Sequence, residues 1–349
     1  MNAYTVTERV ARRGPGGWVR SSGRWLRPLL VLAGTGAVAW LVYQIGPGAI
    51  WATFRHLGWR LLVLLGFPFS VAVVLDTLGW RVLLRDHAVP FGALLRARLA
   101  GEAVNLTTPS ASVGGEPLKA YLLRPHVPLT EALASVVVDK TAVITGQALF
   151  VSAGIAIAAA RLPLSSPLIV SMGGLLAVEI VCIGGFIAVQ TLGVFGGGGR
   201  FLGRMGVGSA QRYQEGLDTL DRSLREFYRE RRVRLIGSAL LHAGAWVTGG
   251  LEVYLVLAFL GLDPSLSTPL AVEAFGAAVK FASFMIPASL GALEGGYVAV
   301  FGAFGFAGAV GLSYTLVRRL REAVWAALGY VWLASLRARP QLPGADGDL

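Results

Sequence analysis

Long runs of apolar residues, separated by short polar stretches, dominate the pattern along the chain. A helix needs about 20 predominantly apolar residues to cross the hydrocarbon core of a bilayer, and several runs reach that length when one or two polar residues are allowed. The pattern predicts an all-α, polytopic membrane helical bundle with about six full spans. The predicted spans cover residues 28–45, 61–84, 130–160, 167–192, 235–260 and 312–336.

Two further segments, residues 91–124 and 270–306, are too broken or too polar to cross as single helices. Proline and glycine free backbone groups, which are tolerated at membrane depth only where protein or a water-filled cavity satisfies them. We therefore expect each segment to form a re-entrant helical hairpin that enters and leaves on one side of the membrane. The breaks are expected at Pro109, Gly114, Gly115, Pro287 and Gly291.

The two breaks resemble each other in sequence. Pro109 precedes Glu116 by seven residues, Pro287 precedes Glu294 by seven, and small residues lie between them in both segments. The first hairpin would enter from the cytoplasm and the second from the opposite side. Such an inverted repeat places broken helices at a midplane binding site in many transporters. The alternative is coincidence in a chain rich in glycine and alanine.

Composition excludes a soluble enzyme, because 54% of the 349 residues are apolar, only 15% are charged and the mean hydropathy is +0.62. The net charge of +11 could suggest a nucleic-acid partner. The arginines, however, fall mostly in loops between apolar segments, which is the ordinary pattern of a membrane protein. We expect no nucleic-acid partner.

The distribution of arginine predicts the topology. Six arginines precede residue 28, which holds residues 1–27 in the cytoplasm, and the lack of a small-residue cleavage site predicts an uncleaved signal anchor. Nine arginines between Arg200 and Arg234 place a loop, residues 193–234, on the same side. This loop contains an amphipathic helix at about 209–234, expected on the membrane face. Residues 28–336 would form a single transmembrane domain of a bacterial plasma membrane protein, with a cytoplasmic tail at 337–349.

Charged residues inside the apolar segments carry the main functional signal. Each would cost roughly 2.5–3.5 kcal/mol if it faced lipid at the bilayer centre, and the sum would exceed the 5–15 kcal/mol of a typical folded protein. They must therefore pair, titrate to neutral, snorkel or face an aqueous interior. Pairing and substrate contact are equally good explanations for any one of them, and a polar cavity is the better explanation for the set. The set is Asp76, Glu102, Glu116, Lys119, Asp139, Lys140, Glu252, Glu273, Lys280, Glu294, Arg318, Arg319, Arg321 and Glu322.

Spacing offers structural explanations for some of these charges. Arg318 and Glu322 are four residues apart, which suits an internal ion pair on one helix. Lys140, next to Asp139 at the expected entrance of a span, could simply snorkel. Cys182 is the only cysteine, so no intramolecular disulfide or cysteine-based metal site is possible. The four histidines are scattered without ligand spacing, so ordinary packing or interface roles are expected for each histidine. No metal, cofactor, Walker-type loop or nucleophile with a partner is indicated.

The ordered motifs resemble one known family. They are Asn105-Leu-Thr-Thr-Pro109, Gly114-Gly-Glu116 with Lys119, Ala134-Ser-Val-Val-Val-Asp139-Lys140, Ile286-Pro-Ala-Ser-Leu-Gly291, Glu294-Gly-Gly and the basic segment Tyr314 to Arg321. Together they resemble the flippase-like family named after the transmembrane region of lysylphosphatidylglycerol synthases, over most of the chain. Gly291-Ala-Leu-Glu294-Gly-Gly followed by Leu316 to Glu322 is most similar to members associated with hopanoid biosynthesis.

The resemblance implies a lipid flippase, a lipid transporter or an accessory to lipid modification. Members with aminoacyl-transferase activity carry a large soluble domain after the membrane part, and only about 13 residues follow Leu336 here, so that activity is not expected. The family often has arginine where this chain has Lys119 and Lys140. Lysine keeps the charge but loses the planar fork of arginine, which weakens the expectation that these two positions clamp a phosphate.

The hypothesis for the site is that Glu116 and Glu294 line the meeting point of the hairpins around a lipid head group. Half-helix N-termini near Gly114 and Gly291 would add dipole contacts, and a proton or ion could couple through the carboxylates. The predicted substrate-binding residues are Asn105, Glu116, Lys119, Asp139, Lys140, Lys280, Glu294, Arg318, Arg319 and Arg321.

Two other functions remain open at this point. One is a membrane-embedded lipid-modifying transferase that uses Glu116 as a general base. The other is a non-catalytic scaffold that recruits enzymes of hopanoid or lipid-linked sugar synthesis through the helix at 209–234.

Overall fold

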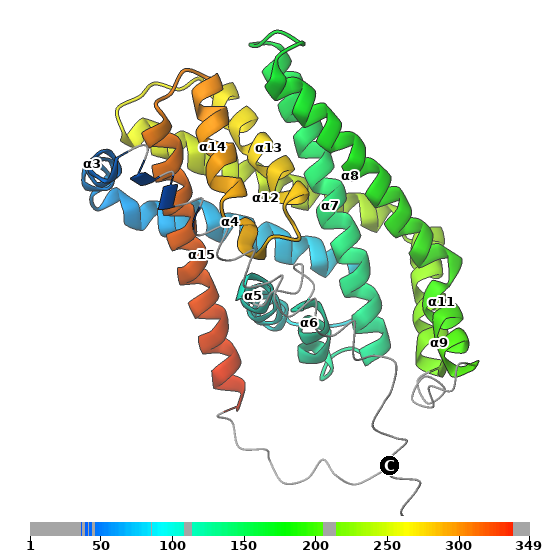
Figure 1. Ribbon diagram of the computed structural model, residues 1–349. Coiled ribbons are helices and arrows are strands. Elements are labelled where there is room, and N and C mark those ends of the chain that lie inside the picture. Colours follow the sequence, from blue (N-terminus) through cyan, green and yellow to red (C-terminus); the bar gives the residue numbers. More distant parts are fainter. Residues whose placement is uncertain are drawn as a thin grey trace, which may run out of the picture.

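A computed structural model describes residues 46–84, 86–107, 114–204 and 214–337, together with residues 36, 39–40 and 42–43. Within these ranges every regular element is a helix (Figure 1). The first group is α3 (Pro47–Leu57), α4 (Arg60–Leu83), α5 (Phe91–Thr107), α6 (Glu116–Leu123), α7 (Leu129–Ala159) and α8 (Pro167–Leu192). The second is α9 (Val194–Arg204), α11 (Gln214–Glu230), α12 (Arg232–Phe259), α13 (Ser267–Ala282), the 3-10 turn η1 (Pro287–Ser289), α14 (Ala292–Ala303) and α15 (Gly308–Arg337).

Four of these helices, α4, α7, α8 and α12, are long and apolar enough to cross a membrane. The chain is therefore a multi-pass membrane protein, and the predicted bounds of these spans agree with the helices within about three residues. The helix α15 has 30 residues but carries four charges between Arg318 and Glu322. The predicted span 28–45, the N-terminal segment 1–27, Pro109 and nearly all of the tail lie outside the described residues. The total of six spans, the re-entrant character of the two hairpins and the sides from which they enter stay predictions.

Two helices were not predicted. The helix α3 occupies the connection between the first two expected spans, and α9 covers the Gly196 to Gly199 stretch that was expected to be a loop. Glycine disfavours helix, but tertiary contacts override the preference here, because the Gly196 amide donates to Asp221 Oδ2 at 2.7 Å. The expected amphipathic helix at 209–234 ends earlier, since the chain breaks at Arg231 (φ −118°, ψ 28°) and α12 begins at Arg232.

The helix α11 packs against the bundle through its apolar face. Leu220, Leu224 and Phe227 are buried against α7. The Tyr228 hydroxyl lies within hydrogen-bond distance of Thr141 Oγ1 (3.0 Å) and Gln190 Oε1 (2.9 Å). Burial of the Tyr228 hydroxyl raises its pKa above the usual value. The apolar face of α11 is therefore covered by other helices of this chain.

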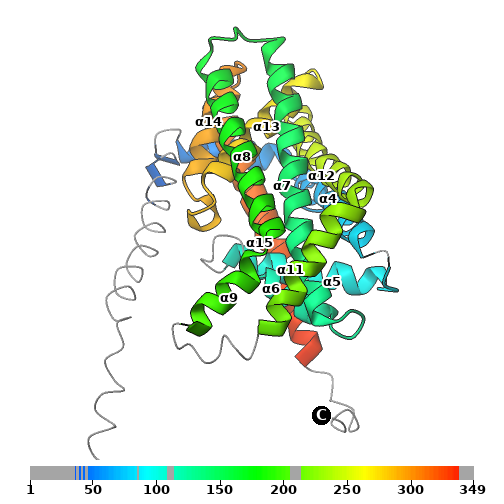
Figure 2. The same ribbon diagram turned by 90° about the vertical axis from the view of Figure 1, so that its right-hand side faces the viewer.

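Glycine allows α12 to pack closely on its neighbours. In Figure 1, α4 and α12 run together across α7 and α15, and Figure 2 shows α7 and α8 as an antiparallel pair. A side chain on Gly146 of α7 would come within 2.6 Å of the Ala239 carbonyl of α12. Small residues at helix contacts are typical of membrane bundles, where close backbone approach replaces hydrophobic burial as the source of packing energy.

The second hairpin is formed by α13 and α14, and the chain between them leaves helical geometry. Ala288 (φ 50°) and Ser289 (φ 52°) are left-handed, and Gly291 has φ 80°. Left-handed geometry at two non-glycine residues is strained and persists only where surrounding structure enforces it. The η1 turn contacts α5 of the first hairpin, so the two broken segments meet in the fold.

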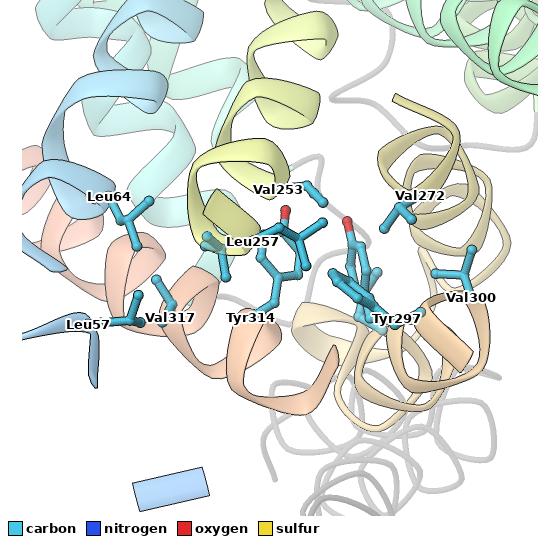
Figure 3. Close-up of a cluster of buried hydrophobic side chains, with 12 residues drawn as sticks. Leu57, Leu64, Val253, Leu257, Val272, Tyr297, Val300, Tyr314 and Val317 are labelled. Atoms are coloured by element: carbon cyan, nitrogen blue, oxygen red, sulfur yellow. The ribbon is translucent and has the colours of Figure 1, made fainter. Parts of the chain in front are cut away.

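A buried apolar cluster joins the second hairpin to the rest of the bundle. Figure 3 shows Leu64, Leu257 and Val317 packed beside Tyr314 and Tyr297. The hydroxyl groups of the two tyrosines lie on the same side of this cluster (Figure 3). They provide polar atoms at the edge of an otherwise apolar core.

Candidate functional site

Glu116, the first residue of α6, is the centre of a polar group between α5, α6 and α7. Its carboxylate accepts from Asn105 Nδ2 at 3.0 Å and lies 3.2 Å from Lys119 Nζ and 3.5 Å from Lys140 Nζ. The side-chain oxygen of Asn105, Oδ1, accepts a hydrogen bond from the Gly115 amide at 2.7 Å. Asn105 thereby connects the end of α5 to the beginning of α6.

Lys119 has a second carboxylate partner on α5. Its buried ammonium lies 2.6 Å from Glu102 Oε1, whereas 52% of the Glu102 side chain is exposed. The two helices can approach this closely because Gly101 faces Gly115, and a side chain on Gly115 would overlap the Gly101 backbone. The Lys119 charge is thus enclosed by protein, and the exposed charge at this point is that of Glu102.

Glu294 caps the first turn of α14. Its Oε2 accepts from the Gly291 amide at 2.8 Å, and its Oε1 accepts from Arg319 Nε at 2.8 Å. Arg319 also lies 3.1 Å from Glu322. A carboxylate that satisfies free amides at a helix N-terminus is a stabilising cap, and Arg319 ties this cap to α15.

Glu273 of α13 is saturated with donors. Arg318 Nη1 lies 2.7 and 2.9 Å from its two oxygens, and Tyr297 (2.7 Å) and Tyr314 (3.0 Å) both donate to Oε2. The two tyrosines are those whose hydroxyls lie together in Figure 3. All four residues are buried, so this group is closed to solvent and its contacts are structural.

A further buried pair joins α12 to α15. Arg321 forms an ion pair with Glu252, and its guanidinium lies 4.4 Å from the centre of the Phe69 ring. The predicted cations Arg318, Arg319 and Arg321 are therefore all in contact with carboxylates of this chain. That they bind a head group stays a prediction.

Four residues form a further group, the third cluster: Asp76 of α4, Arg98 of α5, Asp139 of α7 and His242 of α12. The last three are buried, and the Asp76 side chain is 29% exposed. Arg98 Nη1 donates to Asp139 Oδ2 (3.3 Å), and Arg98 Nη2 lies 3.5 Å from Asp76 Oδ2. His242 places Nδ1 2.6 Å from Asp76 and Nε2 3.0 Å from Asp139. Asp139 lies about three turns into α7, so it belongs to the interior of the protein and not to the entrance of a span.

Lys280 differs from the other predicted cations. Its side chain is exposed, and among the described residues no carboxylate lies within ion-pair distance of its ammonium. Its Nζ lies 5.9 Å from the centre of the Trp246 ring. Lys280 interacts electrostatically with Glu322, Arg318, Glu102 and Glu273, which belong to both hairpins and α15.

The structure thus distributes the predicted residues over distinct groups. Asn105, Glu116, Lys119 and Lys140 lie together at the first hairpin. Glu294, Arg318, Arg319 and Arg321 lie around the second hairpin, and Asp139 lies in the third cluster. Lys280 is within electrostatic range of both hairpins.

Sequence reasoning missed several residues of these clusters. An ordinary packing or interface role was expected for His242, whereas both of its ring nitrogens contact buried or half-buried carboxylates of the bundle. Tyr297 and Tyr314 were not selected because nothing in an apolar run distinguishes a tyrosine that binds a buried carboxylate from one that packs. Arg98 was not selected either, yet it is buried. Its spacing of four from Glu102 was the available signal.

Comparison with known proteins agrees with these features. The family profile described as "Lysylphosphatidylglycerol synthase TM region" matches residues 25–329. A protein of Methanothermobacter thermautotrophicus named "UPF0104 membrane protein" is 27% identical over 311 residues, which cover 84% of this chain and 90% of that protein. No solved structure matches the chain.

Proposed function

The chain belongs to the lysylphosphatidylglycerol synthase transmembrane-region family, and from this premise we propose that it moves a lipid with a polar or anionic head group between the leaflets. Family membership indicates a lipid-related role in the membrane. The head group would pass beside the two hairpins while the acyl chains stay in the bilayer.

The observation that carries the proposal is the exposure of Lys280 and its lack of an ion-pair partner among the described residues. Lys119, Arg318 and Arg319 each contact a carboxylate of the chain, whereas Lys280 is exposed without an ion-pair partner among the described residues. A charged side chain at membrane depth costs roughly 2.5–3.5 kcal/mol when it faces lipid. The phosphate of a lipid would supply the missing counter-charge.

The position of Lys280 suits a translocation path. It lies near the C-terminal end of α13, seven residues before Pro287 and the η1 turn, which contacts α5. The exposed carboxylate of Glu102 lies within electrostatic range of Lys280. With an exposed cation and an exposed anion at the meeting point of the hairpins, the path could bind a zwitterionic head group as well as an anionic one.

The other ionised residues would support this path by fixing its walls. Removing one partner of a buried ion pair costs roughly 3–5 kcal/mol, so these contacts are not available for exchange with a substrate. We assign Glu116, Glu273 and Glu294 to holding the hairpins in place, with Arg319 as the link to α15.

The test is lipid movement in proteoliposomes that contain the full chain and fluorescent phosphatidylglycerol, followed by quenching of the outer leaflet. A hydrogen bond to a charged group contributes about 1.5–3 kcal/mol, so Lys280→Gln should slow movement by roughly 10- to 100-fold, and Lys280→Arg should retain most of the rate. Arg161→Gln, at an exposed position in the loop between α7 and α8, is the control. An unchanged rate in Lys280→Gln rejects the role of this residue, and an inactive wild-type chain rejects the function.

We propose a carrier and not a transferase, because the carboxylate that would act as general base is occupied. Glu116 contacts Asn105, Lys119 and Lys140, and a carboxylate held in these contacts is not open to a substrate hydroxyl. Mass spectrometry of membranes that express the chain should show no new covalent lipid product. A scaffold role through α11 is also less favoured, since its apolar face is packed against α7.

A further inference from the structure

His242 is fully buried between two carboxylates. Nδ1 lies 2.6 Å from Asp76 Oδ1 and Nε2 lies 3.0 Å from Asp139 Oδ1. A neutral imidazole has one N–H and one bare nitrogen, and a bare nitrogen opposite a carboxylate oxygen would place two lone pairs together. A proton is therefore needed in each contact. We propose that the third cluster binds one exchangeable proton, and that His242 carries it.

The charges of the cluster support this assignment. Arg98 and an imidazolium supply two positive charges, and Asp76 and Asp139 supply two negative charges, so the protonated set is neutral. Without the proton this set, of which only Asp76 is partly exposed, would carry one net negative charge, and unbalanced charge is expensive at low dielectric.

Other charged groups around α12 lie further from the ring. From α13, Lys280 lies near Trp246, one turn along α12, and Glu273 meets α12 at Gly249, about two turns away. The helix α11 packs beside Leu235, at the beginning of α12, and α3 packs near Leu257, towards its end. Asp76, Asp139 and Arg98 are therefore the groups that set the protonation of His242.

The ring is held firmly, and one carboxylate connects it to the outside. A side chain on Gly79 would lie 2.8 Å from His242 Nε2, and one on Gly146 would lie 2.9 Å from its Cβ. The ring cannot swing out to collect a proton. The Asp76 side chain is 29% exposed, whereas those of Arg98 and Asp139 are buried. Asp76 is therefore the group through which the proton exchanges with solvent, by transfer between Asp76 Oδ1 and His242 Nδ1.

Proton release would change how the first hairpin is anchored. Arg98 is the residue by which α5 binds this cluster, through the Asp76 carbonyl (3.0 Å) and Asp139. After release, the bare Nδ1 repels Asp76, which can become hydrated, while Asp139 stays paired with Arg98. The contact between α4 and α12 opens, and α5 loses part of its anchor. This link to hairpin movement rests on the proposed function, whereas proton binding does not.

The test is nitrogen NMR of the full chain, labelled with 15N-histidine, in lipid nanodiscs. The His242 signal is assigned by its loss in His242→Gln, and His126→Gln, at an exposed position, is the control. At pH 7 the wild-type ring should be an imidazolium. In Asp76→Asn it should be neutral, because Arg98 and Asp139 then balance each other and the asparagine amide can donate to the bare nitrogen. This variant should therefore stay folded.

A neutral wild-type ring at pH 7, or an imidazolium that persists in Asp76→Asn, would overturn the proposal. Lipid movement by the same proteins separates it from the proposed function. An imidazolium in a chain that moves no lipid leaves the proton site standing and removes the carrier. A wild-type rate that changes with pH and an Asp76→Asn rate that does not would support the coupling, and identical pH profiles would remove it.

Discussion

The buried carboxylate of Glu273 offers a direct measure of what the charge pairs contribute to stability. It receives two contacts from Arg318 Nη1 and one hydrogen bond each from Tyr297 and Tyr314. In Glu273→Gln, a single carbonyl oxygen with two lone pairs replaces the carboxylate, and the new amide is a donor that faces donors. At least two donors therefore lose their partners.

The magnitude follows from these lost contacts. A buried polar group without a partner costs about 1–3 kcal/mol, and two such groups give about 2–6 kcal/mol. Removing one member of a buried ion pair costs roughly 3–5 kcal/mol in other proteins. Because Glu322 remains 3.8 Å from Arg318 Nε, we expect the lower part of this range, about 3 kcal/mol.

The double variant Glu273→Gln/Arg318→Met should recover most of this loss. With the guanidinium removed, the glutamine oxygen can accept from both tyrosines, and no buried charge is left without a counter-charge. The assay is equilibrium unfolding in mixed micelles with rising SDS, followed by tryptophan fluorescence, for the wild type, both single variants and the double variant. Arg200→Met is the control, because its pair with Asp218 is exposed and should contribute no more than about 1 kcal/mol.

Two results would refute the reasoning. If Glu273→Gln costs less than about 1 kcal/mol, the group behaves as a surface pair and is not dry. If the losses of the two single variants simply add in the double variant, the two residues do not interact energetically.

Two further predictions concern the first hairpin and the loop after α4. Gly115→Ala should destabilise the chain by about 1–3 kcal/mol in the same SDS unfolding assay, because its new methyl group would overlap the Gly101 backbone. The control Gly66→Ala, with open space around it, should be neutral or stabilising. The Arg234 hydrogen bond holds the pKa of Asp86 below its usual 3.8. Its stabilisation is therefore present above about pH 4 and lost as the pH falls below that value. Asp86→Asn should lower the melting temperature slightly at pH 7, and the difference should shrink as the pH falls below about 4.

Much of the helical framework could be predicted from sequence alone. The apolar runs around residues 61–84 and 167–192 agree with α4 and α8 because a segment that crosses a bilayer must satisfy its own backbone, and only a continuous helix does so. The breaks near Gly115 and Gly291 were predictable for the same reason, since proline and glycine interrupt that helix. The family was recognisable because its motifs follow in order along most of the chain.

The partners of the charged residues were decided only by the tertiary structure. Asp76, Asp139 and His242 are far apart in sequence and no single motif contains them, and they meet because Gly79 and Gly146 let α4 and α7 approach α12. The cost of burying a charge showed that each ionised group needs a counter-charge or water. Which group it would find depends on helix packing, which is a property of the whole bundle and not of any local pattern.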